Sequence, residues 1–195
     1  MKDGFKISYD TQSHMADVQI GMVSIETERL LITTWTDRDL EDACALWGDP
    51  KVMQFIDVRG GLNRDQVWEK LHQEIERQQK FGVQYWKLLL KETKKTTGCC
   101  GLRPYNLKNR IYEIGFHIMS AYWGKGYASE AANAVIRYAF DKMRAPKLFA
   151  GHNPRNSTSK AMMEKLGFKF VGEQFYEPTG LNHPSYELEA PSKCD

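Results

Sequence analysis

Hydrophobic and polar positions divide the first part of the chain into one strand and two helices. Residues 29–34 form a short apolar run with a β-branched end, which predicts a strand. Thr36 follows and can cap a helix that continues to Trp47. Pro50 disfavours helical backbone at the residue before it, so this helix is expected to end at residues 48–50, with a loop after it. Apolar positions at the helical period then predict an amphipathic helix over residues 64–80.

The pattern then changes to short apolar runs separated by polar links. Strands are expected at residues 84–90, 97–102 and 112–118, and the short links between them favour antiparallel hairpins. Helices at 127–143 and 157–166 then alternate with strands at 147–151 and 168–176. A strand, a long helix and a strand imply a right-handed parallel crossover. We therefore expect an α/β (α+β) fold, a mixed central sheet of about six to seven strands with helices on both faces.

Composition and charge are those of one globular domain. The 195 residues are 42% hydrophobic, and 27 Lys and Arg face 25 Asp and Glu, for a net charge of +2. This balance gives no electrostatic reason to expect nucleic acid or a membrane as a partner. Residues 1–21 lack periodicity and are interpreted as an N-terminal arm or a leader added for expression, before a single domain at 22–190 and a tail at 191–195. No apolar run approaches the ~20 residues of a membrane span, so a cytoplasmic location is expected.

The four cysteines predict neither a metal site nor a disulfide. Cys44, Cys99, Cys100 and Cys194 lack the paired spacing of a zinc site, and reduced thiols are expected. Adjacent cysteines in a strand point to opposite faces, so Cys99 and Cys100 are interpreted as core residues.

Two glycines stand between the predicted strand 112–118 and the helix that follows it. Gly124 and Gly126 would let backbone N–H groups approach a ligand closely, and the first turn of the helix attracts anions such as pyrophosphate. Lys125 adds a charge. Two glycines alone more often mark an ordinary tight turn before a helix. The spacing does not match a Walker loop, and Ser129 stands where a dinucleotide fingerprint needs Gly or Ala.

Five sequence blocks in a fixed order resemble the GCN5-related N-acetyltransferases (GNAT), and within them the ribosomal-protein N-terminal acetyltransferase branch. The resemblance covers residues 25–188, and one departure is Ala121, where the wider family has Gln or Arg. The blocks are Glu26-Thr27-Glu28-Arg29-Leu30-Leu31, Asp49-Pro50-Lys51-Val52-Met53, Glu113-Ile114-Gly115-Phe116, Asn156-Ser157-Thr158-Ser159 and Glu164-Lys165-Leu166-Gly167-Phe168.

The resemblance implies that acetyl-CoA, without a metal, lies between splayed parallel strands at 112–118 and 147–151. Its pantetheine arm would pair with Phe116, His117 and Ile118 and contact Asn156. Its pyrophosphate would meet the backbone of the turn, which comprises Trp123, Gly124, Lys125, Gly126, Tyr127, Ala128 and Ser129.

Glu113 and Ser159 are the candidate catalytic residues. An α-amine has a pKa of about 8, so a carboxylate such as Glu113 can remove its proton directly or through water. A salt-bridged strand residue is an equal interpretation of Glu113. The resemblance places the Ser159 hydroxyl near the sulfur, where it could protonate the thiolate, although Asn156 and Ser159 also suit a helix start. His117, an isolated histidine, is interpreted as structural rather than catalytic.

The acceptor side is expected between the first two helices and beyond the last strand, at Phe55, Arg59, Tyr176 and Glu177. Trp68, Tyr85 and Trp86 could add an aromatic wall, but aromatic residues at these spacings usually belong to the core.

Three functions remain open on this sequence. The first is acetylation of a protein N-terminal α-amine, by a monomer or homodimer. The second is acetylation of a small amine such as an antibiotic or polyamine, for which Asp57, Asp65 and Glu69 provide a modest carboxylate cluster. The third is a non-catalytic acetyl-CoA sensor.

Overall fold

The computed structural model describes residues 23–191. The predicted arm at 1–21, the residues of the tail after Pro191, and Cys194 lie outside the described residues.

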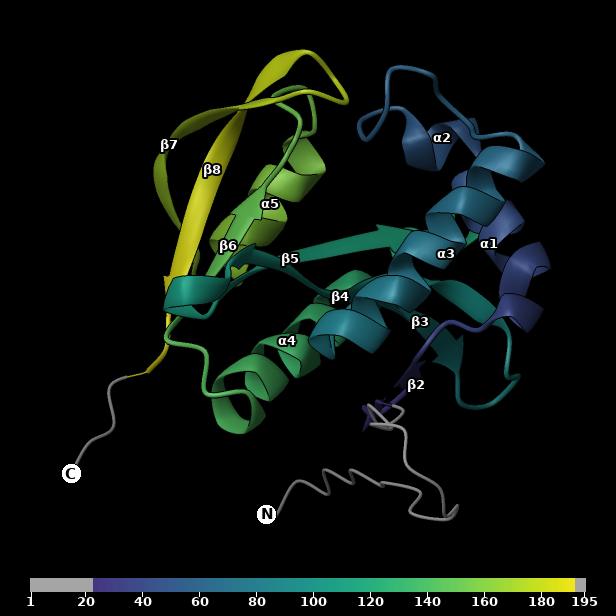
Figure 1. Cartoon of the computed structure of the whole chain (residues 1–195), viewed down its shortest axis with the longest axis horizontal. Coiled ribbons are helices and arrows are strands. Elements are labelled where there is room, and N and C mark those ends of the chain that lie inside the picture. Colours follow the sequence, from purple (N-terminus) through teal and green to yellow (C-terminus); the bar gives the residue numbers. More distant parts are fainter. Residues whose placement is uncertain (1–22, 192–195) are drawn as a thin grey trace.

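A mixed sheet forms the centre of the molecule (Figure 1). Within the described residues it has eight strands in the order β1-β2-β3-β4-β5-β6-β8-β7. All neighbours are antiparallel except β5 and β6. The strands are β1 (Ser24–Glu26), β2 (Leu30–Thr33), β3 (Tyr85–Leu90), β4 (Thr96–Asn106), β5 (Ile111–Ile118), β6 (Lys147–Gly151), β7 (Lys169–Tyr176) and β8 (Leu181–Glu189).

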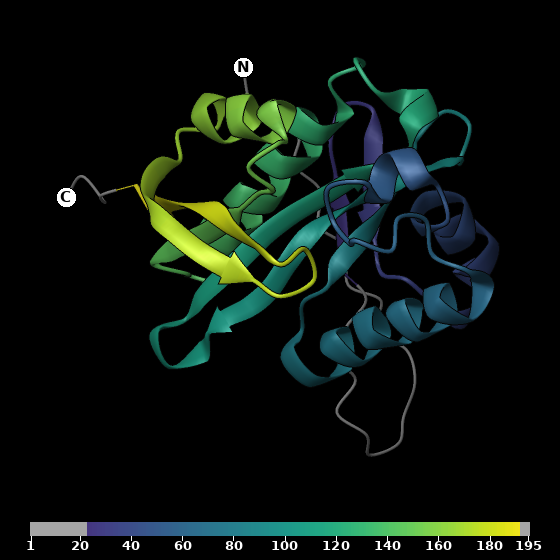
Figure 2. The same ribbon diagram turned by 90° about the horizontal axis from the view of Figure 1, so that it is seen from above.

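Helices cover both faces of the sheet, as the sequence predicts (Figure 2). On one face a core that includes Trp35 and Trp47 packs beneath the first three helices. On the other face Ala132 and Val135 contact a larger core over the central strands. The helices are α1 (Leu40–Trp47), α2 (Pro50–Met53), α3 (Arg64–Phe81), α4 (Tyr127–Arg137) and α5 (Ser157–Lys165).

The parallel pair β5 and β6 separates soon after it begins. The two strands are in register only at Tyr112 with Leu148 and at Glu113 with Phe149. From Ile114 onward β5 has no neighbour on that side, while β6 stays paired with β8 as far as Gly151. A gap therefore opens in the sheet at the C-terminal ends of both strands.

Three elements of the structure were not predicted from the sequence. Strands β1 and β8 were not predicted, and β8 lies between β6 and β7, so the last predicted strand is not a neighbour of β6. The predicted loop after Pro50 begins with the one-turn helix α2, because Asp49 Oδ1 accepts a hydrogen bond from the Lys51 N–H and Pro50 suits the first helical position.

The boundaries of the longer helices also differ. Thr36 precedes a 3-10 turn, Asp37–Asp39, rather than a regular α-helical turn, and its N–H and hydroxyl both donate to the Asp39 carboxylate. The helix predicted over 127–143 is α-helical to Arg137 and continues as a turn of π-helix at Tyr138–Lys142.

Cys99 and Cys100 are fully buried and unpaired, which confirms their placement in the core. Across residues 23–191, no helix is long and apolar enough to cross a membrane. That same part of the chain holds no cluster of three His, Cys, Asp or Glu suited to a metal ion.

Candidate active site

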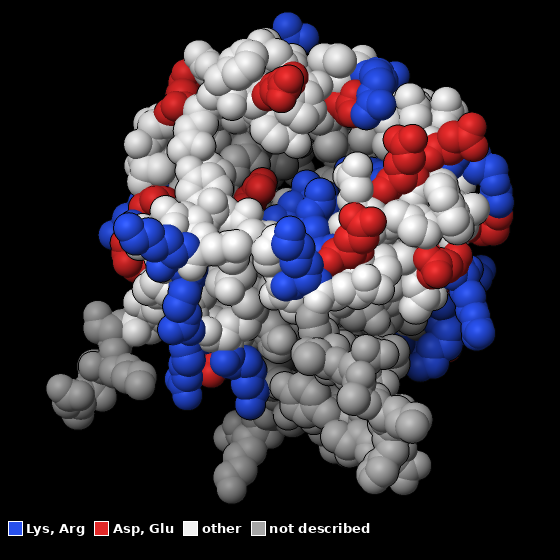
Figure 3. Space-filling model, viewed as in Figure 1, with Lys and Arg blue, Asp and Glu red and all other residues white. Residues whose placement is uncertain are grey.

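A cavity of about 750 Å³ occupies the gap between β5 and β6. Figure 3 shows the molecule hollowed between the β7–β8 hairpin and the first helices, with basic side chains gathered beside the hollow. The predicted site residues that line the cavity are Glu113, Ser159, Phe116, His117, Ile118, Trp123, Gly124, Gly126, Tyr127, Ala128, Ser129, Asn156, Phe55 and Tyr176.

Three predicted site residues are not among those that line the cavity. Lys125 is exposed, and its carbonyl accepts a hydrogen bond from Arg29 Nη1 at 3.0 Å. Arg59 forms an ion pair with Asp57 at 2.6 Å and lines a separate hollow of about 100 Å³. Glu177 is exposed in the turn between β7 and β8. The Lys125 ammonium lies 5.3 Å from the centre of the Tyr122 ring, and Tyr122 itself lines the cavity.

The turn before α4 has the backbone of an anion site. Gly124 and Gly126 have φ of +74° and +79°, a region that strongly favours glycine. A Cβ at Gly124 would enter open space with no atom within 4 Å. Glu130 N donates to Gly126 O, and the N–H groups of the residues between them have no intrahelical acceptor. The start of α4 therefore presents free N–H donors and the positive end of a helix dipole to the cavity.

Residues between β1 and β2 hold this turn in place through contacts with the first turn of α4. The Glu130 carboxylate accepts hydrogen bonds from Thr27 Oγ1 at 2.5 Å, Arg29 N at 2.8 Å and Arg29 Nε at 2.7 Å. The Arg29 guanidinium lies 4.6 Å from the centre of the Tyr127 ring. These contacts tie the first turn of α4 to the segment between β1 and β2.

The backbone N–H and C=O groups of alternate residues in β5 face the gap between β5 and β6. Met119 N donates to Thr97 O, so the hydrogen bonds of His117 in the same ladder are also directed at β4. Phe116 and Ile118 therefore present their N–H and C=O groups to the open edge, but the Ile118 carbonyl already accepts the Trp123 indole N–H at 2.7 Å. Of the three residues predicted to pair with pantetheine, Phe116 has the backbone best placed to do so.

Glu113, Gly115 and His117 lie on the face of β5 that points toward α3. A Cβ on Gly115 would lie 2.3 Å from the Tyr85 hydroxyl, so this hydroxyl occupies the space above Gly115. Burial raises the pKa of the Glu113 carboxyl, while the positive charge of Arg103 and the Tyr85 hydroxyl act in the opposite direction. A partly buried carboxylate with a raised pKa is a suitable proton acceptor in this cavity.

His117 is neutral in this position. Its Nδ1 accepts the Trp47 indole N–H at 3.1 Å, which fixes the tautomer because an indole nitrogen can only donate. Burial holds the pKa of His117 well below its usual value. These contacts agree with the structural role expected of this histidine.

Ser159 and Asn156 are brought together at the start of α5. The Asn156 side-chain oxygen accepts a hydrogen bond from Ser159 N at 3.0 Å, the capping contact that the sequence suggested. Both residues also line the cavity, and within residues 23–191 the Ser159 hydroxyl has no hydrogen-bond partner. That hydroxyl remains available to a ligand.

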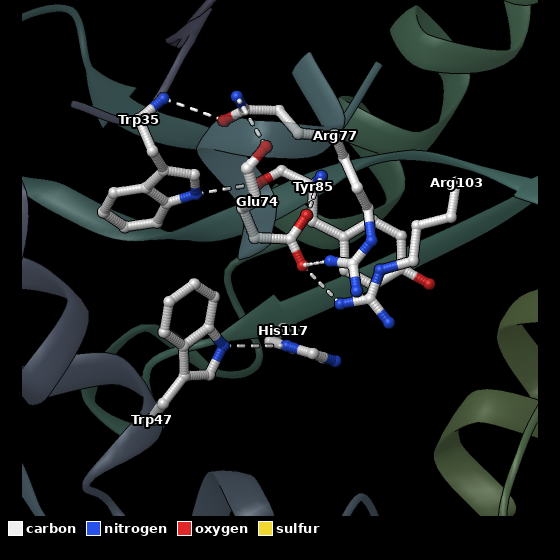
Figure 4. Close-up of polar contacts among 8 residues, drawn as sticks. Trp35, Trp47, Glu74, Arg77, Tyr85, Arg103 and His117 are labelled. Carbon is white, nitrogen blue, oxygen red and sulfur yellow. Dashed lines mark hydrogen bonds and ion pairs between the residues drawn. The ribbon is translucent and has the colours of Figure 1, made fainter. Parts of the chain in front are cut away.

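A buried ionic network borders the cavity on the α3 side (Figure 4). Glu74 is fully buried, and its carboxylate pairs with both Arg77 and Arg103 and accepts the Tyr85 N–H at 3.0 Å. Tyr85 stacks against the Arg103 guanidinium, 3.9 Å from the ring centre. No pattern in the sequence pointed to Arg103 or to Lys70, which also lines the cavity, because both occupy ordinary polar positions.

Comparison with known proteins supports the resemblance to the acetyltransferases that the sequence shows. Residues 29–169 match the acetyltransferase (GNAT) domain family. The chain is 31% identical over 146 residues to the protein YkkB of Bacillus subtilis strain 168, covering 74% of this chain and 84% of that one. It is 26% identical over 151 residues to the uncharacterized N-acetyltransferase p20 of Bacillus licheniformis, covering 77% and 85%.

A solved structure agrees with these matches. The GNAT-family acetyltransferase from Bacillus anthracis aligns with a TM-score of 0.74 and 26% identity, over 86% of this chain and 98% of that one. The chain therefore belongs to the GNAT acetyltransferase family. It is an acetyl-CoA-dependent N-acetyltransferase.

Proposed function

We propose that this enzyme acetylates the α-amine of a peptide N-terminus by direct attack on acetyl-CoA within one ternary complex. One continuous cavity lined by both the turn before α4 and Glu113 carries the proposal, since the donor and the acceptor can then meet without a covalent enzyme intermediate.

Different residues of the chain would bind different parts of acetyl-CoA, the acetyl donor. The free N–H groups at the start of α4 suit the pyrophosphate, and the open edge of β5 at Phe116 suits an amide of the pantetheine arm. The bound cofactor supplies the acetyl thioester.

Glu113 and Ser159 would move the protons. Glu113 accepts a proton from the acceptor ammonium, and the neutral nitrogen forms a bond to the acetyl carbon as the carbon–sulfur bond breaks. Ser159 delivers a proton to the departing thiolate and regains one from the amide nitrogen or solvent. Because an α-amine has a pKa of about 8, a single carboxylate suffices as the base.

Two observations bear on the acceptor. Val58 N donates to Pro178 O at 3.2 Å, so the loop after α2 meets the β7–β8 turn across the cavity and favours an amine at the end of a chain. The carboxylates that would attract a polyamine, Asp57, Asp65 and Glu69, do not line the cavity. A small amine remains a second candidate, because a cavity of this volume is typical of small-molecule sites.

Thiol release from acetyl-CoA with a panel of N-terminal peptides, beside a panel of small amines, tests the proposal. We expect turnover with peptides whose α-amine is free and none with the same peptides blocked at the N-terminus. Turnover confined to small amines would replace the peptide acceptor, and hydrolysis without any acetylated amine would overturn the proposed reaction.

A further inference from the structure

We propose that Lys70 and Arg103 form a carboxylate-binding subsite beside Glu113, so that the preferred acceptor amine also carries a carboxylate. The inference rests on the proposed function and specifies its acceptor. The carboxylate belongs either to an acidic residue near a peptide N-terminus or, for the small-amine candidate, to a free amino acid, and the test below distinguishes the two.

The first observation is the charge of the cavity lining. Its basic residues are Lys51, Lys70 and Arg103, whereas Glu113 is the one carboxylate among the lining residues that the structure describes. The pyrophosphate of the donor is assigned to the turn before α4 and does not need Lys70 or Arg103. Uncompensated basic charge therefore lies on the acceptor side.

Arg103 is held in place, and Glu74 does not use all of its guanidinium N–H donors. Glu74 is shared with Arg77 and also accepts a backbone N–H, so its single negative charge serves two guanidinium groups. Stacking on Tyr85 fixes the plane of the Arg103 guanidinium. The Arg103 side chain keeps 20% of its surface exposed and lines the cavity. The guanidinium N–H groups that Glu74 does not use can therefore donate to a bound carboxylate.

Lys70 adds a second cation from α3, one turn before Glu74. Its ammonium lies 5.3 Å from the centre of the Trp47 ring, and in the described part of the chain it has no carboxylate within ion-pair distance. Burial and the neighbouring charge of Arg103 lower the pKa of Lys70 to about 8. Two like charges held close together in a partly buried site favour an anion between them.

The local balance leaves room for one more negative charge. Lys70, Arg77 and Arg103 are three cations, and they face the two carboxylates of Glu74 and Glu113. Asp57 also acts on Lys70, but its charge is balanced by the ion pair with Arg59. Glu113 must also be free to take a proton during the reaction. A carboxylate on the acceptor would complete the balance and orient the amine toward Glu113.

The test compares acceptors that differ only in one carboxylate. Amino acids are measured beside their C-terminal amides, and dipeptides with glutamate at the second position beside those with glutamine. The wild-type enzyme is compared with Lys70→Gln, with Lys70→Arg as the conservative variant and Lys80→Gln, at the exposed end of α3, as the control. The pKa difference between paired amines is the same for every variant, so it cancels in the comparison.

We expect wild-type kcat/KM to be ~10-fold or more higher for the carboxylate member of at least one pair type, as one charged hydrogen bond implies. Lys70→Gln should bring this ratio close to one, Lys70→Arg should restore much of it, and Lys80→Gln should leave it unchanged. The pair type that shows the preference identifies the source of the carboxylate.

Calorimetric titration of the acetylated products in the presence of CoA gives a second measurement that needs no turnover. The acid should bind ~10-fold more tightly than its amide to the wild type and equally to Lys70→Gln. Equal binding to the wild type, or a carboxylate preference that survives in Lys70→Gln, would overturn the subsite. Acetylation of neutral amines without any carboxylate preference overturns the subsite and leaves the proposed reaction intact, whereas the absence of any acetylated amine overturns the reaction itself.

Discussion

At the scale of single residues, the acceptor side of the cavity combines one carboxylate with a cationic surface. Burial disfavours the ionised form of Glu113, and Arg103 moderates that effect from the paired position on β4. A base in this setting has a higher proton affinity than an exposed glutamate. This is the property that removal of a proton from an ammonium group requires.

Replacement of Glu113 by Gln is expected to lower kcat/KM by ~100-fold or more, which is typical for loss of a general base. The wild-type pH–rate profile should rise with pH through the raised pKa of Glu113, and this limb should disappear in the variant. Exposed Glu76→Gln on α3 serves as the control, and a Glu113→Gln profile of unchanged height and shape would remove Glu113 as the base.

The same substitution has a consequence for stability. Because the pKa of Glu113 is raised in the folded state, its favourable contribution is present below the pKa of the unfolded chain and is lost as pH rises through the raised pKa. At pH 7, Glu113→Gln should therefore melt no lower than the wild type.

The resemblance identified Glu113, but Lys70 and Arg103 could not be predicted, because their importance depends on sharing Glu74 and the cavity across elements far apart in sequence.

At the scale of elements, the backbone conformation of the turn before α4 determines how well the turn can bind an anion. Its glycines have a left-handed backbone, and the contact between Arg29 and Glu130 ties the turn to the segment between β1 and β2. The sequence predicted this turn, its helix and the strand before it with nearly correct bounds. It did not predict β8, where Pro184 lacks the N–H of a ladder donor and interrupts an already polar alternation.

Gly124→Ala tests the turn against a matched control, Gly60→Ala in the loop after α2. Both glycines have φ of +74°, and a Cβ at either would meet nothing within 4 Å. Each substitution should cost ~1 kcal/mol of stability, a fall in Tm of ~2–4 °C. Only Gly124→Ala should also weaken acetyl-CoA binding, by ~10-fold, because the methyl group occupies the space over the free N–H donors. Calorimetric titration showing equal affinity in the two variants would contradict this role for the turn.

At the scale of the whole molecule, the sheet consists of two parts that touch over a short length. Strands β1 to β5 form one part and β6 to β8 the other, and they are in register at only two residue pairs. Outside that register, Tyr105 stacks on Phe149 at 4.0 Å, and the Val58 to Pro178 hydrogen bond joins the loops. A ligand in the gap would contact both parts and stabilise the folded chain by binding alone.

Hydrogen exchange with acetyl-CoA at about 100 times its Kd tests this arrangement, since such saturation adds ~2.7 kcal/mol of stability. The Phe116 amide faces the open edge and should become strongly protected when the pantetheine arm pairs with it. The His117 amide already faces β4, so its protection should rise only with the global stability, which makes it an internal control one residue away. Pantetheine, which lacks the pyrophosphate, should give weaker protection at the same concentration. Equal gains at Phe116 and His117 would mean that the cofactor does not extend the sheet from β5, and that the splayed strands hold it through side chains instead.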